Sequence, residues 1–347
     1  MPAPSLLHLT APFAPLAEER AVTLLAATHG LAVDQIDRLE TERDDTFRVR
    51  TGAGRFVAKF AHPLDDAAVL GDQLAVLEAL ARAQPELPVQ RVLPARDGAP
   101  LTTVDDGAGR PRLLRVLSYL EGEPLGSAAR SLTEMHALGA LHARLAVAIA
   151  TIGDAAHPPL QGAPTPWNLL ALEQYGPLAG GLADTTLRRE VARVVDRVRD
   201  AVLSRARALP ALLAHNDLHG DNVLVRSEPF TVTGVLDFGD MTRTPRAADL
   251  AVAASYARGR VGDAGEPWAA ARAYVSGYER TAPLTDDERA LLPELVLLRL
   301  AQRAILNTAI AAANPAATPY ASRNLSAIAR DLRELGASIP STIGDPA

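Results

Sequence analysis

Cysteine is absent from this sequence of 347 residues, and lysine is almost absent. Without thiols the chain forms no disulfide bonds, holds no thiolate-bound metal and has no cysteine nucleophile, so any metal must bind to oxygen or imidazole ligands. Lysine and arginine together number 35, yet only Lys59 is a lysine. The two cations are not interchangeable in shape or hydration. Lys59 is therefore a candidate for a specific chemical role, against the alternative that one surface lysine survived by chance.

The sequence also lacks a basic stripe and a long apolar run. Its formal charge is −6, with arginine and acidic residues interspersed, which argues against a nucleic-acid binder and disfavours an anionic membrane surface. No stretch approaches 18 consecutive apolar residues, and the N-terminal segment has no signal-peptide pattern. The 48% hydrophobic and 22% charged fractions are those of a soluble globular protein. We expect a cytoplasmic monomer or homodimer without nucleic-acid or membrane partners.

The chain length predicts two lobes, since domains commonly have about 100 to 200 residues. In the first 120 residues, an amphipathic helix precedes three runs with β character, a second helix and two further strands. Their expected ranges are 16–29 for the first helix, 33–39, 47–51 and 55–60 for the three strands, 65–83 for the second helix, and 90–94 and 113–119 for the last strands. This pattern predicts a small antiparallel sheet with one internal helix.

From residue 121 onward the pattern is mainly helical, with one island of β character. The expected helices are 132–149, 187–208, 268–278, 286–313 and 321–335, and residues 222–237 are expected to form a hairpin. We therefore predict an α+β fold with two lobes: an N-lobe over 1–120 that binds nucleotide, and a larger helical C-lobe over 121–340 that carries the catalytic loop and the substrate site.

Polar residues gather on both sides of the predicted hairpin. The segment HNDLHGDN occupies 215–222, and LDFGD occupies 236–240. Strand pairing brings Asp217, Asn222 and Asp237 to one pocket, where their oxygens suit a hard cation such as Mg²⁺. The order Asp, four residues, Asn, hairpin, Asp-Phe-Gly is that of a kinase catalytic loop and metal-binding motif. Asp217 would accept the proton of an attacking hydroxyl, Asn222 and Asp237 would hold Mg²⁺, and Lys59 would reach the α and β phosphates.

These motifs resemble the aminoglycoside phosphotransferase and choline kinase superfamily, which has a protein-kinase-like fold. The stretch 215–222 resembles that superfamily's HxDxxxxN loop, and the resemblance covers nearly the whole chain. The run LDFGDM at 236–241, followed by ADLA at 248–251 and ASYA at 254–257, looks most like the hydroxylysine kinase branch and its bacterial relatives. Asn216 stands where the usual motif has Gly.

The resemblance implies how the N-lobe binds nucleotide. The turn ERDDTF at 42–47 looks like the superfamily's stand-in for a glycine-rich loop, with Thr46 where Asn is frequent. The stretch 113–122 looks like the last strand and hinge, so the nucleotide base is expected against Ser118, Tyr119 and Leu120. Gln73 stands where kinases carry the Glu that pairs with the lysine. Lys59 would then be positioned by Gln73 through a hydrogen bond, or by Glu78.

Candidate substrate contacts lie on a predicted helix and two loops. Arg299, Arg303 and Asn307 recur every four residues on one face of an apolar helix. Either the arginines form salt bridges between packed helices, or Arg299 or Arg303 binds a substrate carboxylate. Trp167 in a proline-rich loop is a second candidate for the pocket wall, and Asp240 for either the substrate or the surroundings of the metal.

One further aspartate and two histidines have more ordinary interpretations. Asp249, which we place just before an apolar helix, either caps that helix or braces a loop. His215 and His219 are four residues apart, but we do not expect a metal pair there. In the resembled families the first His is structural, and the oxygen ligands nearby prefer Mg²⁺.

The expected reaction is transfer of the γ-phosphoryl of ATP or GTP to a hydroxyl of a small metabolite. An amino alcohol or hydroxy amino acid, hydroxylysine-like or homoserine-like, is the leading acceptor. An aminoglycoside is the alternative and would require an acidic pocket. A nucleotide-binding module without catalysis belongs to another class; it would lack a Lys, Asp or Asn of the motifs, and none is missing.

Overall fold

The computed structural model describes residues 11, 14–41, 44–126, 130–157, 160–163, 165–199, 201–257, 266–314, 318 and 322–344. The N-terminal part is an antiparallel sheet with the strand order β1-β2-β3-β6-β4, and β5 pairs with β6. The strands are β1 (Val33–Leu39), β2 (Asp45–Thr51), β3 (Gly54–Phe60), β4 (Val92–Leu93), β5 (Thr102–Asp105) and β6 (Pro111–Ser118).

One face of this sheet is closed by helix α2 (Glu18–His29), which ends at Gly30 in the left-handed conformation. Because strand side chains alternate between faces, Phe47, Ala58 and Phe60 point into an apolar core shared with α2. Lys59, between two of them, points the other way. Strand register places Thr46 of β2 and Arg115 of β6 opposite Lys59 of β3. The three side chains therefore form one row across the face opposite α2, where Thr46 and Arg115 are buried.

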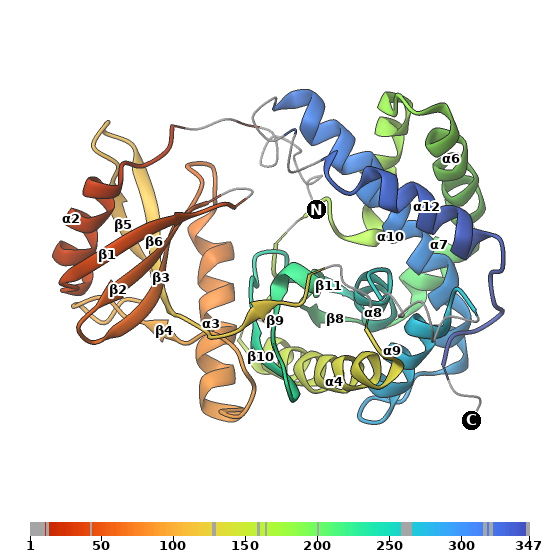
Figure 1. Ribbon diagram of the computed structural model, residues 1–347, viewed down its shortest axis with the longest axis horizontal. Coiled ribbons are helices and arrows are strands. Elements are labelled where there is room, and N and C mark those ends of the chain that lie inside the picture. The colour runs from red at the N-terminus through yellow and green to blue at the C-terminus, as the bar shows by residue number, and fades with distance from the viewer. Residues whose placement is uncertain are drawn as a thin grey trace.

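Helix α3 (Ala67–Ala83) lies between this sheet and the helical part (Figure 1). The Asp66 side chain caps it by accepting a hydrogen bond from the N–H of Ala68 at 2.8 Å. Its buried residues Leu74, Leu77 and Leu80 belong to the large core of the C-terminal part. The helix thus joins the two parts through apolar packing.

The C-terminal part is mainly helical and carries two small sheets. Its helices are α4 (Leu132–Ala155), α5 (Leu172–Tyr175), α6 (Thr185–Arg199), α7 (Ala201–Ala208), α8 (Arg246–Ala254), α9 (Ala269–Glu279), α10 (Asp286–Ala313) and α12 (Leu325–Gly336), with short 3₁₀ turns η1 (Leu169–Ala171), η2 (Gly176–Gly181) and η3 (Gly220–Asn222). One sheet has the order β10 (Phe230–Val235), β9 (Val223–Ser227), β7 (Glu123–Pro124), and the other pairs β11 (Thr242–Pro245) with β8 (Ala211–Ala214). Helices α4 and α9 approach closely, since a Cβ on Gly139 or Gly277 would collide with the facing backbone.

The predicted α+β class and kinase-like arrangement are confirmed. The first strand and helix α10 have the expected bounds, and the hairpin is β9 and β10. The expected helix over 187–208 is two helices, α6 and α7. The helix expected over 321–335 is α12, beginning at Leu325, and residue 321 lies outside the described residues. Strands β5, β7, β8 and β11 have two to four residues, too few for a sequence pattern to reveal.

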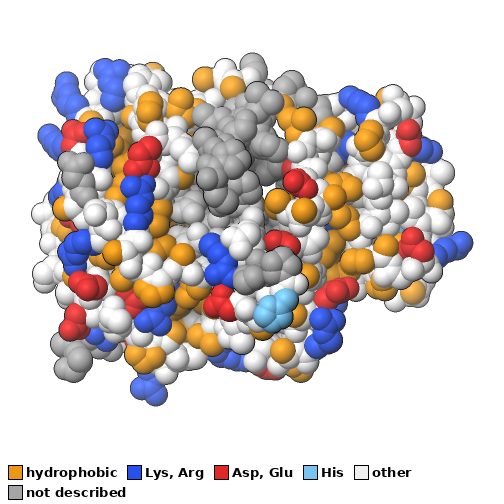
Figure 2. Space-filling model, turned by 180° about the vertical axis from the view of Figure 1, so that it is seen from behind, with side chains coloured by type: hydrophobic (Ala, Val, Ile, Leu, Met, Phe, Trp, Pro, Cys, Tyr) orange, Lys and Arg blue, Asp and Glu red, His pale blue; other side chains and the backbone are white. Residues whose placement is uncertain are grey.

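Helices α4 and α10 are long and apolar enough to span a membrane by length and composition alone. Half of the apolar stretch of α4 and 72% of that of α10 are buried inside the protein. They are core helices that pack against α9 and α8 respectively. On the face shown in Figure 2, arginine and acidic side chains are interspersed over the described residues, without a large field of one sign.

Candidate active site

The predicted catalytic loop runs from β8 to β9 and is fixed to the hairpin that follows it. His215 accepts a hydrogen bond from the N–H of Asp217 at Nδ1 (3.3 Å), which leaves Nε2 as the donor to the carbonyl of Leu236 at 3.1 Å. The His215 ring also packs on Phe238, and burial lowers its pKa. His215 therefore links the loop to the Asp-Phe-Gly segment as a neutral structural residue, as expected.

The residue before Asp217 has an uncommon backbone conformation. Asn216 is at φ 63°, in the left-handed region that Gly and Asn tolerate best. Its buried N–H donates to Oδ1 of Asp249 at 2.7 Å, and Oδ2 of Asp249 lies 2.8 Å from Nε2 of His142. Burial opposes the charge on Asp249, but His142 and the Asn216 hydrogen bond outweigh it and lower the pKa.

Asp249 therefore braces the catalytic loop, one of the two roles expected for it. The other role, capping, is wrong, and so is its position before the helix. Asp249 lies inside α8, whose N-cap residue is Pro245.

Asp217 has hydrogen-bond donors at both carboxylate oxygens. Arg299 Nη2 donates to Oδ1 at 2.9 Å, and Asn222 Nδ2 donates to Oδ2 at 2.9 Å. His219 Nε2 lies 3.3 Å from Oδ2. Burial alone would raise the pKa of Asp217, but His219 and Arg299 outweigh it and hold the pKa below its usual value. Asp217 is thus an ionised and tightly oriented carboxylate.

Asn222 and Asp237 supply the oxygens expected for a cation. The Asn222 amide nitrogen is turned toward Asp217, so its oxygen is the end left for a ligand. Backbone pairing brings the two residues together, since the N–H of Leu236 donates to the Asn222 carbonyl at 2.8 Å. Lys59 lowers the pKa of Asp237 to about 2. One carboxylate and one carboxamide suit Mg²⁺, which binds few protein oxygens together with phosphates and water. The described residues hold no cluster of three or more His, Cys, Asp or Glu that fits a metal.

Lys59 reaches across from the sheet to the Asp-Phe-Gly segment. Its Nζ lies 3.6 Å from Oδ2 of Asp237 and 3.5 Å from Oδ2 of Asp44. Gln73 instead donates to the carbonyl of Gly239 at 3.2 Å. Within the part of the chain that the structure describes, no hydrogen bond or ion pair joins Lys59 to Gln73 or Glu78. Asp44 and Asp237 hold the lysine in their place.

Of the other expected nucleotide residues, Thr46 lies beside Lys59 in the sheet, whereas Ser118, Tyr119 and Leu120 lie at or just beyond the end of β6. Thr46 is 4% exposed, and its Oγ1 has no hydrogen-bond partner among the described residues. Ser118 pairs with Arg91 through backbone and side chain, and the N–H of Tyr119 donates to Arg55. No hydrogen bond among described residues engages the backbone of Leu120. Glu42 and Arg43 of the expected nucleotide loop lie outside the described residues.

A polar pocket opens beside Asp217 and brings all four substrate candidates together. Its lining residues are Trp167, Asp217, His219, Asp221, Asp240, Tyr256, Arg299, Arg303, Asn307, Arg323 and Asn324. Arg299 is 1% exposed and also donates to the carbonyl of Trp167 at 3.2 Å and to Gln302 at 2.9 Å. Its ion-pair partner is Asp217, which lies in the predicted catalytic loop. The expected salt bridge between packed helices is therefore wrong for Arg299.

The other candidates occupy the pocket wall. Arg303 lies over the ring of Tyr256, 3.9 Å from its centroid, and Tyr256 stacks on His219. Asp240 accepts a hydrogen bond from Thr165 at 2.8 Å. Sequence reasoning missed Tyr256 as a pocket residue, although it lies in the ASYA run.

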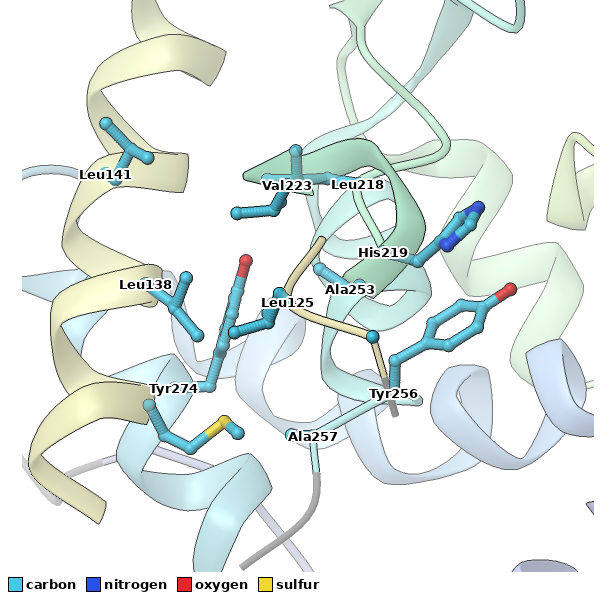
Figure 3. A pocket seen from close by; sticks show the side chains of 13 residues that line it. Leu125, Leu138, Leu141, Leu218, His219, Val223, Ala253, Tyr256, Ala257 and Tyr274 are labelled. Atoms are coloured by element: carbon cyan, nitrogen blue, oxygen red, sulfur yellow. The ribbon is translucent and has the colours of Figure 1, made fainter. Parts of the chain in front are cut away.

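A second, apolar pocket lies on the other side of the same stack. Figure 3 shows Leu138 and Leu141 of α4, Tyr274 of α9 and Leu125 facing one another, with His219 and Tyr256 at one edge. The Tyr274 hydroxyl lies 3.2 Å from Nδ1 of His142. His219 and Tyr256 thus separate an apolar pocket from the polar one that contains Asp217.

Comparison with known proteins agrees with this geometry. The model of the phosphotransferase enzyme family matches residues 35–284, well over half of the chain. The chain belongs to that family. It is an enzyme that transfers phosphoryl groups, and its relatives are small-molecule kinases. Hydroxylysine kinase of Xenopus laevis is 25% identical over 313 residues, 84% of this chain and 82% of the relative.

Solved structures confirm the fold of this family member. The amicoumacin kinase hAmiN in complex with AMP-PNP, Ca²⁺ and Ami has a TM-score of 0.68 and 18% identity, covering 94% of this chain and 96% of that one. The microcompartment-associated aminopropanol kinase has a TM-score of 0.67 and 19% identity, covering 94% and 100%. At these identities the likeness concerns the fold alone.

Proposed function

We propose that this phosphotransferase moves the γ-phosphoryl of ATP or GTP to the hydroxyl of a hydroxy amino acid or an amino alcohol. The observation that carries the proposal is the mixed charge of the pocket beside Asp217. Asp221 and Asp240 line it together with Arg303 and Arg323. A small molecule with both an amine and a carboxylate complements such a wall, and hydroxylysine and homoserine have this chemistry.

An aminoglycoside acceptor is less well supported. A polycation requires uncompensated acidic groups, but at least two of the three acids in this pocket have cationic partners: Asp217 is paired with Arg299, and Asp221 with Arg323 at 2.6 Å. A nucleotide-binding module without catalysis would lack a residue of the kinase motifs. The sequence does not support that alternative, since Lys59, Asp217, Asn222 and Asp237 are all present.

Asp217 would orient the acceptor hydroxyl and take its proton late in the reaction. Its lowered pKa makes it a weak base at neutral pH, which suits a loose phosphoryl-transfer transition state in which positioning and charge stabilisation dominate. Oriented donors on both oxygens hold the carboxylate in one geometry for the hydroxyl. Lys59, at the sheet, would bind phosphate oxygens.

Mg²⁺ is part of the proposal, with Asn222 and Asp237 as its protein ligands. When bound, it neutralises negative charge on the phosphates. We also propose a cytoplasmic enzyme that acts as a monomer or homodimer, and the lack of cysteine is compatible with a reducing compartment.

The test is a screen for ADP or GDP release with purified enzyme, Mg²⁺ and either nucleotide. Hydroxy amino acids, amino alcohols and aminoglycosides are the three acceptor panels, and each hit is checked by mass spectrometry of the phosphorylated product. Turnover with the first or second panel is expected. Turnover confined to aminoglycosides would reject the proposed acceptor class, and nucleotide binding without any acceptor would favour the module.

Arg303→Met separates the two preferred panels. If Arg303 meets a carboxylate, this variant raises KM for the hydroxy amino acid by about 10-fold or more, the cost of one charge-assisted hydrogen bond. It leaves KM for the matching amino alcohol nearly unchanged. Equal effects on both acceptors would contradict a carboxylate contact.

A further inference from the structure

Arg115 is a second buried cation on the nucleotide side of the sheet. It lies on β6 directly opposite Lys59 of β3 in the strand register, so the two side chains share a face. Arg115 is 5% exposed. A guanidinium this deeply buried within the apolar run LLRVL at 113–117 has a substantial desolvation cost, which only a partner or a ligand offsets.

The two cations meet at one oxygen atom. Arg115 Nη2 donates to Oδ2 of Asp44 at 2.8 Å, and Lys59 Nζ lies 3.5 Å from the same oxygen. A phosphate oxygen is commonly bound in this way, by an ammonium and a guanidinium together. The Asp44 carboxylate thus occupies the position of an anion between two cations.

The donors of this row are not all used. Arg115 Nη1 is buried and has no hydrogen-bond partner among the described residues, and the same holds for Oγ1 of Thr46 on the other side of Lys59. Buried polar atoms without partners are rare in proteins and call for an explanation, such as an absent ligand. Here both lie in the row that contains the lysine expected to bind phosphate.

The charges of the row and of the two aspartates beside it balance when no nucleotide is bound. Lys59 and Arg115 are positive, and Asp44 and Asp237 are negative. When Asp237 binds a metal and anionic phosphates arrive, Asp44 becomes a surplus negative charge beside them. The two cations then have the nucleotide as an alternative partner.

We infer that Arg115 binds the nucleotide phosphates next to Lys59, and that Asp44 neutralises both cations until a nucleotide replaces it. This inference rests on the proposed function, because it requires a nucleotide at Lys59. It adds a phosphate ligand and an internal anion that competes with the nucleotide.

The test is equilibrium titration of ADP, the magnesium complex of a non-hydrolysable ATP analogue, and adenosine. Arg115→Met is expected to weaken binding of both nucleotides by about 10- to 100-fold, the range for one charge-assisted hydrogen bond. Adenosine binding is expected to stay unchanged. Arg110→Met is the matched control, since Arg110 is an exposed arginine in the turn before β6, paired with Asp106. Melting curves without nucleotide check that each variant folds.

A double-mutant cycle with Asp44→Asn separates direct binding from mere support of Asp44. Asp44→Asn is expected to tighten nucleotide binding, and Arg115→Met is expected to weaken it at least as much in the Asp44→Asn background as in wild type, because no carboxylate then competes for the guanidinium. If Arg115 acts only by holding Asp44, the arginine substitution has no effect once Asp44 is neutral, and the inference is overturned. Unchanged nucleotide affinity in folded Arg115→Met overturns it as well. A wild-type protein that binds no nucleotide would reject the proposed function itself.

Discussion

The two halves of the candidate active site are held in place by different means. On the sheet side, Thr46, Lys59 and Arg115 stand on three adjacent strands, and regular backbone pairing sets their spacing. On the helical side, Asp217 lies in a loop with no regular pairing, and buried side chains determine its position. Asp249 accepts a hydrogen bond from the N–H of Asn216, and Arg299 donates one to the carboxylate of Asp217.

This difference indicates how each half should respond to substitution. A strand keeps its register when one side chain changes, so substitutions on the sheet side should alter charge and nucleotide affinity more than folding. In the catalytic loop, the groups that orient Asp217 are also buried polar contacts of the core. Substitutions there should affect catalysis and stability together.

The largest effect is expected at Asp217. Asp217→Asn should lower kcat by about 10²- to 10⁴-fold, the usual contribution of a positioned acid or base. Nucleotide affinity should remain, because Lys59 and the hinge are unchanged. Product release assays and nucleotide titration measure the two properties, with Asp154→Asn, an exposed aspartate paired with Arg243, as control. Normal turnover in Asp217→Asn would contradict the assignment of the catalytic residue.

Removing Arg299 should couple activity, pH dependence and stability. Arg299→Met leaves a largely buried carboxylate without one of its cations, which costs about 2 to 5 kcal/mol. Arg299 contributes to the low pKa of Asp217, so its loss raises that pKa. The ionised form then declines at a higher pH, and the acidic limb of the kcat/KM profile should shift upward. A profile with an unchanged acidic limb would show that Arg299 is only a packing residue.

On the sheet side, Lys59→Arg keeps the charge and changes shape and reach. The wider guanidinium must fit between Asp44 and Asp237, which lie 3.5 and 3.6 Å from the ammonium. We expect kcat/KM to fall by about 10²-fold, as for loss of one preorganised donor, with little change in melting temperature. Full activity would mean that the only lysine in the chain is there by chance.

The smallest effect is expected at Asn216. Asn216→Gly removes a buried amide whose two polar atoms lack partners among the described residues, and glycine accepts φ 63° without strain. The added freedom of the unfolded chain opposes this gain, so unfolding free energy should change by less than about 1 kcal/mol. Asn216→Ala should destabilise by about 1 to 2 kcal/mol. Urea denaturation measures both, and a glycine variant less stable than the alanine variant would contradict the conformational argument.

Sequence patterns predicted the long elements and which residues would lie near one another at the candidate site. The hydrophobic period of 3.6 residues predicted the bounds of α10. Pairing within the hairpin brings Asn222 and Asp237 close together, as expected. The partner of Arg299 was not predictable, because periodicity assigns a residue to a helix face while the packing of α10 decides what that face meets. Asp217 lies 82 positions away in the chain.

The sequence held a weak signal for the burial of Arg115. Arg115 is a single charge inside the apolar run LLRVL, a pattern that marks a buried cation with a specific partner. Its neighbour Lys59 follows only from the pairing of β3 with β6, two strands separated by a helix and two further strands. The short strands β8 and β11 frame the catalytic segment, yet four residues each carry no readable alternation.

The rarity of lysine has a practical consequence for studying this enzyme. A reagent that acylates side-chain amines has one target along the chain, Lys59, whose side chain is 14% exposed and faces the proposed phosphate site. A bound nucleotide would cover that amine. The fraction of acylated Lys59, read by mass spectrometry of a single peptide, would therefore report how many molecules hold a nucleotide, without any engineered label.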